Sequence, residues 1–264
     1  MPIKTAGIKT NRSYNTRILK GGALLEEMRQ LVRSWNDAQT QELKEIAVRS
    51  NVLNKTTRAR AADILRRVYI PRFVDGPIPN AWKMARSLED QNAAPTIVRP
   101  VYYWISARAE PLIFDFTTEY LLPRLNSARA GVGVQDVLGW LSLKGCNWSP
   151  TSAIKVARGL LAALRDFGIL EGGSKKRLAS RRLPNEAFAY LAFCFNALGA
   201  AGRHLVFHPD WQLFLLQTPE VEHEFLEAHQ RRLLEYHAAG STISISFPCS
   251  TLEEYARVVV GRSN

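Results

Sequence analysis

Cysteines are few in this 264-residue sequence, and no apolar run is long enough to cross a membrane. The three cysteines, Cys146, Cys194 and Cys249, form no CxxC pair. We therefore expect neither a disulfide framework nor a zinc knuckle, and a reducing, cytoplasmic location fits best. The uncharged stretch at 187–202 has 16 residues, fewer than the ~20 that span a bilayer. It predicts a buried helix, and because the N-terminus lacks the apolar core of a signal peptide, no membrane association is expected.

The motifs of common enzyme classes are also missing. The sequence has no P-loop lysine in a glycine-rich loop, no GxSxG and no HExxH. The stretch GVGVQD at 131–136 lacks the third glycine of a dinucleotide fingerprint. His204 and His208 are four residues apart, but no third metal ligand stands at a suitable spacing. We therefore expect a protein that is not an enzyme and needs no metal or cofactor.

Positive charge is abundant and is gathered in two blocks. The net charge is +11, with +9 in residues 1–72, zero in 73–149, +6 in 150–185 and −4 in 186–264. Two separate basic blocks favour two places where phosphate groups dock, as in a nucleic-acid-binding protein. The acidic C-terminal block is unsuited to DNA and is a candidate surface for protein partners or for self-association.

Hydrophobic spacing predicts a mainly α fold with small β elements. We expect four segments: an N-terminal helical domain with a helix-turn-helix-like element at 1–75, a helical middle segment at 76–128, a winged helix at 129–185, and an acidic α+β extension at 186–264. The middle segment is punctuated by prolines. In the extension, TISISF at 242–247 alternates polar and apolar residues like a strand.

The segment 129–185 has the clearest pattern. A short helix at 134–143 is followed by a loop, and Ser149 and Pro150 predict the start of a second helix as N-cap and first helical residue. That helix should end at Gly168. Gly172 and Gly173 can supply the positive backbone φ of a tight hairpin. The order helix, turn, helix, hairpin is that of a winged helix.

The second of these helices has one apolar and one polar face. Its apolar face is predicted to comprise Ile154, Ala157, Leu160, Leu161, Leu164 and Phe167. On the polar face, a helix in a major groove reads bases mainly from its N-terminal residues. Thr151, Ser152 and Lys155 are therefore candidates for base contacts, and Arg158 and Arg165 for phosphate contacts. The alternative is an ordinary solvated helix face.

Two further basic clusters are candidate DNA contacts. The hairpin carries Lys175, Lys176, Arg177, Arg181 and Arg182, which would reach a phosphate backbone or a minor groove. The alternative is a solubilising basic loop. Near the N-terminus, a turn at 50–57 precedes a helix at 57–70 that is expected to stop at Pro71. Its candidate contacts are Lys55, Arg58, Arg60, Arg66 and Arg67, and a protein-interaction surface is the alternative there.

Three blocks carry a family resemblance: ILKGGALLEEMRQLV at 18–32, RSNVLNKTTRARAADILRRVYIPRF at 49–73 and SPTSAIKVARGLLAALRDFGIL at 149–170. In this order and spacing the chain resembles the BrxA family of the BREX phage-exclusion systems of bacteria. The resemblance implies a small, non-enzymatic component encoded beside a DNA methyltransferase and ATPases. It further implies a largely helical fold with helix-turn-helix elements that binds DNA.

The expected function is binding of double-stranded DNA within a phage-defence assembly, with other BREX proteins as possible partners. One alternative is a transcriptional regulator of its own operon, which would keep a large preference for one short site. The other is a scaffold that binds RNA or protein through its basic faces.

Overall fold

Most of the chain is helical, and the computed structural model describes residues 14–35, 53, 57–127, 131–179, 183–240 and 242–262. The predicted mainly α class is confirmed. The N-terminal half contains η1 (Arg17–Leu19), α1 (Leu25–Ser34), α3 (Arg58–Ile64), η3 (Leu65–Val74), α4 (Ala81–Asp90), α5 (Pro95–Ala109), α6 (Pro111–Asp115), η4 (Phe116–Leu121) and η5 (Leu122–Ser127). The C-terminal half contains α7 (Val134–Leu143), α8 (Pro150–Asp166), β1 (Leu170–Glu171), β2 (Arg177–Leu178), α9 (Asn185–Ala197), α10 (Arg203–Val206), η6 (Pro209–Phe214), α11 (Thr218–Gln230), β3 (Glu235–Ala239), β4 (Thr242–Ser246) and α12 (Leu252–Gly261).

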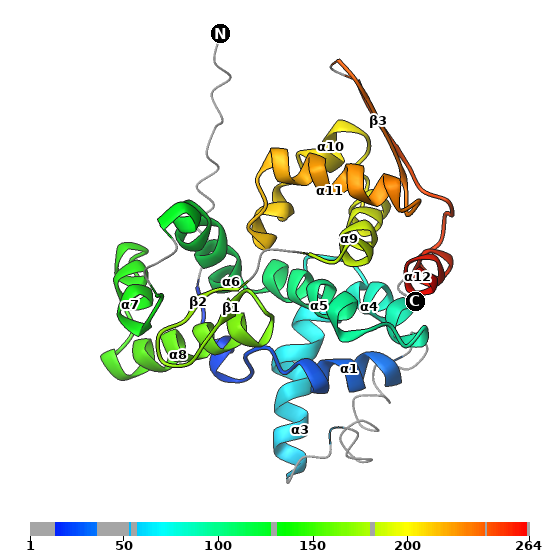
Figure 1. Cartoon of the computed structure of the whole chain (residues 1–264). Coiled ribbons are helices and arrows are strands. Elements are labelled where there is room, and N and C mark those ends of the chain that lie inside the picture. The colour runs from blue at the N-terminus through cyan, green and yellow to red at the C-terminus, as the bar shows by residue number, and fades with distance from the viewer. Residues whose placement is uncertain are drawn as a thin grey trace.

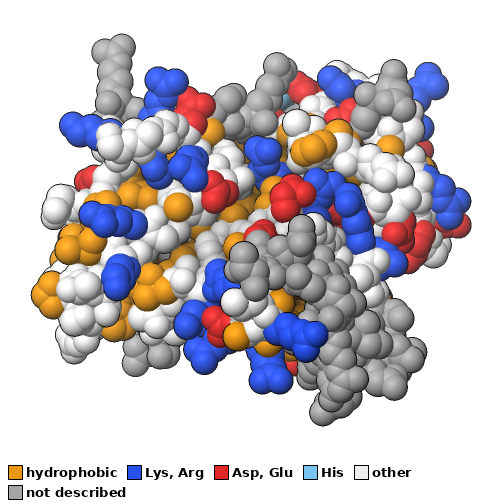
Figure 2. Space-filling view, turned by 90° about the horizontal axis from the view of Figure 1, so that it is seen from below, with side chains coloured by type: hydrophobic (Ala, Val, Ile, Leu, Met, Phe, Trp, Pro, Cys, Tyr) orange, Lys and Arg blue, Asp and Glu red, His pale blue; other side chains and the backbone are white. Residues whose placement is uncertain are grey.

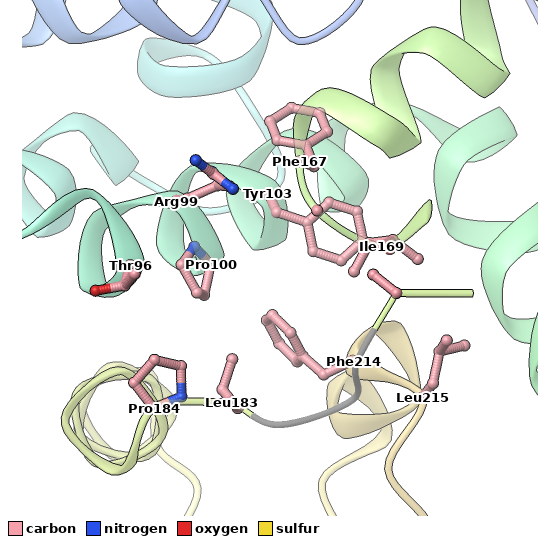
Figure 3. A pocket seen from close by; sticks show the side chains of 12 residues that line it. Thr96, Arg99, Pro100, Tyr103, Phe167, Ile169, Leu183, Pro184, Phe214 and Leu215 are labelled. Carbon is pink, nitrogen blue, oxygen red and sulfur yellow. The ribbon is translucent and has the colours of Figure 1, made fainter. Parts of the chain in front are cut away.

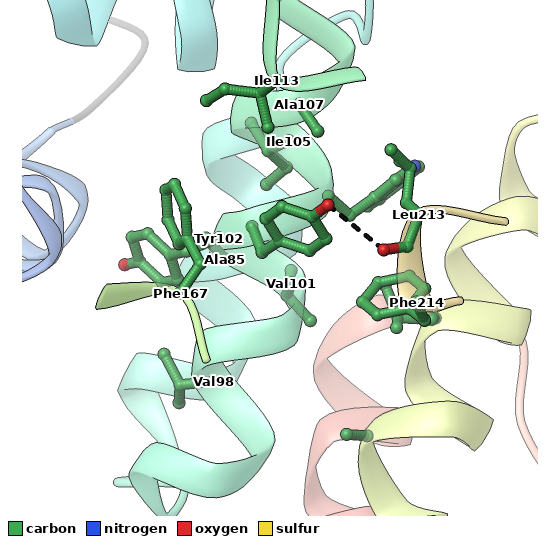
Figure 4. Packing of buried hydrophobic residues seen from close by; sticks show 14 of the residues in the cluster. Ala85, Val98, Val101, Tyr102, Ile105, Ala107, Ile113, Phe167, Leu213 and Phe214 are labelled. Atoms are coloured by element: carbon green, nitrogen blue, oxygen red, sulfur yellow. Dashed lines mark hydrogen bonds between the residues drawn. The ribbon is translucent and has the colours of Figure 1, made fainter. Parts of the chain in front are cut away.

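Helix α5 is the centre around which the other helices pack. Its residues from Val101 to Ala107 carry no charge and are all buried, as expected of a helix that is covered on every side. It contacts η3, α4, α6, α9 and η6. The Tyr103 hydroxyl donates a hydrogen bond to the Leu213 carbonyl over 3.1 Å, which ties α5 to η6 (Figure 4).

The uncharged stretch at 187–202 contains most of α9, a buried helix, as predicted. Its residues from Ala187 to Phe195 are all buried, and the helix lies against α5, α11 and α12. Among the helices of the described residues, none has the length and hydropathy that crossing a membrane requires.

The helix that begins at Arg58 runs past Pro71, so the prediction that it stops there is wrong. Thr57 caps it by accepting a hydrogen bond from the Arg60 N–H, and η3 then continues as a π-helix to Val74. In a π-helix each N–H reaches the carbonyl five residues back, as the Asp75 N–H does to Ile70 over 2.9 Å. This wider turn gives the proline ring room that an α-helix lacks.

Arg72 fastens this helix to the N-terminal segment. Its guanidinium is fully buried and donates to the carbonyls of Gly21 and Gly22, over 3.0 and 2.8 Å. Residues 36–52 and 54–56 lie outside the described residues, and with them most of the predicted N-terminal helix-turn-helix-like element.

In the described part of the chain, two small antiparallel sheets complete the fold, and each consists of two strands joined as a hairpin. Strand β4 confirms the strand predicted from TISISF, and it pairs with β3 from Glu235 opposite Ser246 to Ala239 opposite Thr242. The hairpin projects from the helices (Figure 1). The last helix, α12, packs on both α4 and α9. The C-terminal segment is therefore in contact with the middle of the chain.

Candidate nucleic-acid interface

Helix α8 begins where the sequence predicts. Pro150 occupies the first helical position, and the Ser149 hydroxyl oxygen accepts a hydrogen bond from the Ser152 N–H over 3.3 Å. The Ser149 hydroxyl also lies 2.9 Å from the Ser152 hydroxyl. Ser152 is half-buried and engaged in the cap, whereas Thr151 is exposed.

One face of α8 is covered and the opposite face is open. The buried residues are Val156, Ala157, Leu160, Leu161, Ala163, Leu164 and the capping Phe167. This confirms most of the predicted apolar face, although Ile154 is only half-buried. On the other side, Thr151, Lys155, Arg158 and Arg165 are all exposed. An exposed polar surface is therefore available on this helix.

The N-terminal segment covers one flank of α8, which the sequence analysis did not anticipate. A Cβ at Gly159 would lie 3.6 Å from the Ile18 carbonyl oxygen, and a Cβ at Gly22 would lie 3.5 Å from the Ala163 Cβ. The absence of larger side chains at these positions allows the two backbones to approach closely. A glycine in the middle of a predicted helix was the available signal for such an approach.

The hairpin predicted after α8 is present. Strands β1 and β2 pair with Leu170 opposite Leu178 and Glu171 opposite Arg177, and Gly172 in the turn has a φ of 97°. Val132, which lies just before α7, adds a third short element, because its N–H donates to the Lys176 carbonyl over 2.6 Å and its carbonyl accepts from the Lys176 N–H over 3.0 Å. The hairpin is thus tied to the start of α7.

The basic residues of the hairpin differ in their surroundings. Lys175 is exposed. Lys176 is only 8% exposed, and its ammonium donates to the Gly173 carbonyl over 2.7 Å. Arg177 is exposed, but its Nε lies 2.6 Å from Glu171 Oε1. Arg181 and Arg182 lie outside the described residues.

The basic residues near the N-terminus surround one acid. Asp63 forms ion pairs with Lys20, Arg60 and Arg67, at 3.6, 3.8 and 2.7 Å. Arg58 and Arg66 are exposed on the same helical segment, and Lys55 lies outside the described residues. Residues 17–22 connect the two candidate surfaces. Ile18 of η1 lies against α8, and Lys20, which follows η1, pairs with Asp63 of α3.

Lysine and arginine side chains are spread over the face seen in Figure 2 and form no single continuous patch there. In Figure 1, α7, α8 and the β1–β2 hairpin lie together at one end of the molecule, whereas α3 projects from its middle. At the C-terminal end of α8, Arg165 binds Asp166 through Nε and Nη2, over 3.0 and 2.7 Å. Its charge is therefore partly neutralised.

Comparison with solved structures supports the fold. The crystal structure of an uncharacterized protein from Magnetospirillum magneticum is similar, with a TM-score of 0.55 and 17% sequence identity. The similarity covers 70% of this chain and 95% of that chain. At this identity it shows a shared fold alone. A comparison with curated proteins gives no match.

The family comparison is more specific. The BrxA family model matches residues 12–193, which is more than half of the chain and includes α8 and the β1–β2 hairpin. The chain therefore belongs to the BrxA family of the BREX phage-exclusion systems, the family that its sequence blocks resemble.

Proposed function

We propose that this protein is a non-catalytic component of a BREX-type phage-defence system that binds double-stranded DNA. Helix α8 would enter the major groove, and the β1–β2 hairpin would contact the neighbouring phosphate backbone. The observation that carries this proposal is the open polar face of α8, on which Thr151, Lys155 and Arg158 are all exposed while the opposite face is packed in the core.

The order of the surrounding elements supports this placement. Two consecutive helices, α7 and α8, are followed by a hairpin, and Val132 pairs with that hairpin from the other side of α7. Helix-turn-helix proteins place the second helix in the major groove and read bases from its N-terminal residues. Thr151 and Lys155 lie in the first two turns of α8 and would face the base edges.

Ion pairing separates the basic residues into two groups. Arg165 and Arg177 are paired with Asp166 and Glu171. For Lys155, Arg158 and Lys175, no carboxylate within the described part of the chain lies at ion-pair distance. These three side chains can bind phosphate without first breaking an ion pair within the protein. We therefore assign to them the largest electrostatic contribution to DNA affinity. Each phosphate neutralised adds about 0.9 to the slope of log affinity against log salt.

Fluorescence anisotropy with a labelled duplex of about 30 base pairs, or three helical turns, tests the proposal. The wild type should bind saturably and weaken steeply between low and moderate salt. The double variant Lys155→Glu/Arg158→Glu should lose at least tenfold in affinity. Arg203→Glu/Arg257→Glu makes the same change of charge at two exposed positions on α10 and α12, and it should lose much less. Equal losses in both variants would place binding elsewhere, and no binding at low salt would contradict the proposal.

Competition experiments separate this function from its alternatives. Unrelated duplex should compete well, because the proposed contacts are mostly to phosphates. A persistent preference for one short site would instead indicate an operon regulator. Tighter binding of RNA than of duplex DNA would favour the scaffold alternative. Plasmid incubated with the protein and Mg²⁺ or Mn²⁺ should stay intact.

A further inference from the structure

A cavity of about 200 Å³ lies between α5, the C-terminal end of α8 and η6. Arg99 and Tyr103 of α5 form one side, Phe167 and Phe214 contribute aromatic rings, and Leu183 closes the side toward α9 (Figure 3). The walls are mostly apolar, and no acidic residue is among the described residues that line the cavity. Ligand sites are commonly concave and apolar with a few polar groups that fix orientation, and this cavity has that composition on a small scale.

The aromatic side of the cavity is held rigidly. The Tyr103 ring lies 5.4 Å from the Phe167 ring and 5.6 Å from the Phe214 ring, measured between centroids. The Tyr103 hydroxyl is engaged with Thr117 and with the Leu213 carbonyl, so it is not left to face a ligand. The cavity is therefore preformed, which reduces the entropic cost of filling it.

Among the described residues that line this cavity, Arg99 is the charged one, and part of its guanidinium lacks a partner there. Its Nε is buried and finds no hydrogen-bond acceptor within the described part of the chain. The side chain passes over Gly168, where a Cβ would lie 3.5 Å from Nη1 and 3.6 Å from Cδ. A buried donor without an acceptor costs stability. Such a group at the edge of an apolar cavity is expected where an anionic ligand supplies the acceptor.

The first turn of α5 adds a smaller contribution of the same sign. Thr96, the second residue of this 15-residue helix, also lines the cavity. The positive end of the helix dipole lies in that turn and stabilises a nearby anion.

We propose that this cavity binds a small organic carboxylate of about the size of benzoate. The carboxylate pairs with the guanidinium of Arg99, and the apolar body packs against Tyr103, Phe167 and Phe214. A single guanidinium among the described, mostly apolar lining residues suits a monoanion, because a phosphate dianion needs more donors than these residues carry. The exposed residues Thr151, Lys155 and Arg158 are not among the described residues that line the cavity, so this proposal does not rest on DNA binding.

Titration of the full chain with benzoate, followed by amide NMR, tests this site directly. Benzoate should shift the amide resonances of Gly168 and Ile169 saturably, since both residues line the cavity. Benzamide has the same shape without the charge and should bind at least tenfold more weakly. The variant Arg99→Gln should lose at least tenfold in benzoate affinity, whereas Arg203→Gln, an exposed arginine on α10, should bind like the wild type.

A second variant tests the cavity without changing its charge. Ala179→Leu adds volume at a lining position and should also abolish the saturable shifts, while a thermal melt reports whether the variant is folded. Equal binding of benzoate and benzamide, or unchanged benzoate binding by Arg99→Gln, would overturn the proposal. Phenyl phosphate binding as tightly as benzoate would contradict the carboxylate assignment. Absence of shifts with benzoate and with hexanoate at roughly 20 mM, well above a millimolar dissociation constant, would show that the cavity holds solvent only.

Discussion

Glu171 and Arg177 face each other across the β1–β2 hairpin, with Glu171 Oε1 2.6 Å from Arg177 Nε. Both side chains are substantially exposed, so the pair contributes little to stability. The pair does neutralise part of the charge of Arg177, and so reduces the positive charge that the hairpin would present to DNA under the proposed function.

The first prediction follows from this pair. Glu171→Gln should tighten DNA binding and make its salt dependence steeper by about one unit of slope, because Arg177 becomes available for one more phosphate. The measurement is the anisotropy titration at several salt concentrations. Glu235→Gln removes an exposed acid from the distant β3 strand and serves as the control. Equal changes in the two variants would mean that only net charge matters.

The second prediction separates two adjacent lysines. Lys175 is exposed, whereas Lys176 is buried as a residue and its ammonium donates a partly buried hydrogen bond to the Gly173 carbonyl. Lys175→Ala should weaken DNA binding several-fold and leave the melting temperature nearly unchanged. Lys176→Ala should lower the melting temperature, because it removes a partly buried hydrogen bond worth about 1 kcal/mol. Thermal melts and anisotropy on the same samples check this, and the opposite pattern would contradict it.

The local features of the candidate site could be predicted from the sequence. Ser149 and Pro150 define the start of α8 through cap chemistry, and the 3.6-residue period separates its packed face from its open face. The two glycines after Glu171 predict the hairpin. Each of these signals lies within a few residues of the feature that it predicts, so no long-range contact had to be known.

The features that could not be predicted depend on distant parts of the chain. Lys176 is buried because its backbone pairs with Val132, 44 residues earlier. Likewise, the flank of α8 is covered by Ile18, and the helix passes Pro71 where Arg72 is held by the carbonyls of Gly21 and Gly22. A one-dimensional pattern does not specify such pairings. The pairing of Glu171 with Arg177 could have been predicted from the sequence, because a tight hairpin places its flanking residues opposite each other.

The third prediction concerns the close approach of Gly159 to Ile18. A Cβ at Gly159 would meet the Ile18 carbonyl at 3.6 Å and nothing nearer, which is an ordinary contact. Gly159→Ala should therefore raise the free energy of unfolding by up to about 1 kcal/mol, through the higher helix propensity of alanine. Gly159→Leu should lower it, because the longer side chain forces the N-terminal segment away from α8. Urea unfolding measures both, and equal stability of the two variants would argue against this contact.

The fourth prediction concerns the buried pair of Arg72 and Glu110. Arg72 Nε lies 3.3 Å from Glu110 Oε1, and both side chains are almost fully buried. Burial lowers the pKa of the Arg72 guanidinium, and Glu110 opposes that shift. Glu110→Gln should reduce the free energy of unfolding by about 3–5 kcal/mol, since it leaves a buried charge without its counter-ion.

The exposed pair of Arg165 and Asp166 is the matched comparison for this fourth prediction. Asp166→Asn should change the free energy of unfolding by less than about 1 kcal/mol. A small loss in Glu110→Gln would mean that the carbonyls of Gly21 and Gly22 satisfy Arg72 without the acid.

The fifth prediction is a pH dependence set by His208. Burial lowers the pKa of this histidine from its usual 6.5, and Arg108 lowers it further while Asp210 opposes both. The ring is stacked on Phe195 at 4.2 Å, and its Nδ1 accepts a hydrogen bond from the Asp210 N–H. Because the folded state binds this proton less readily than the unfolded state, stability should fall as the pH drops below about 6.5 and stop falling below the folded-state pKa.

His208→Gln keeps a hydrogen-bond acceptor but cannot titrate, so its stability should decline less over that range. Urea midpoints measured from pH 7.5 to 5 test this, with His204→Gln as the control for removing an exposed imidazole. Parallel pH profiles for the wild type and His208→Gln would show that other groups govern the acid sensitivity of the fold.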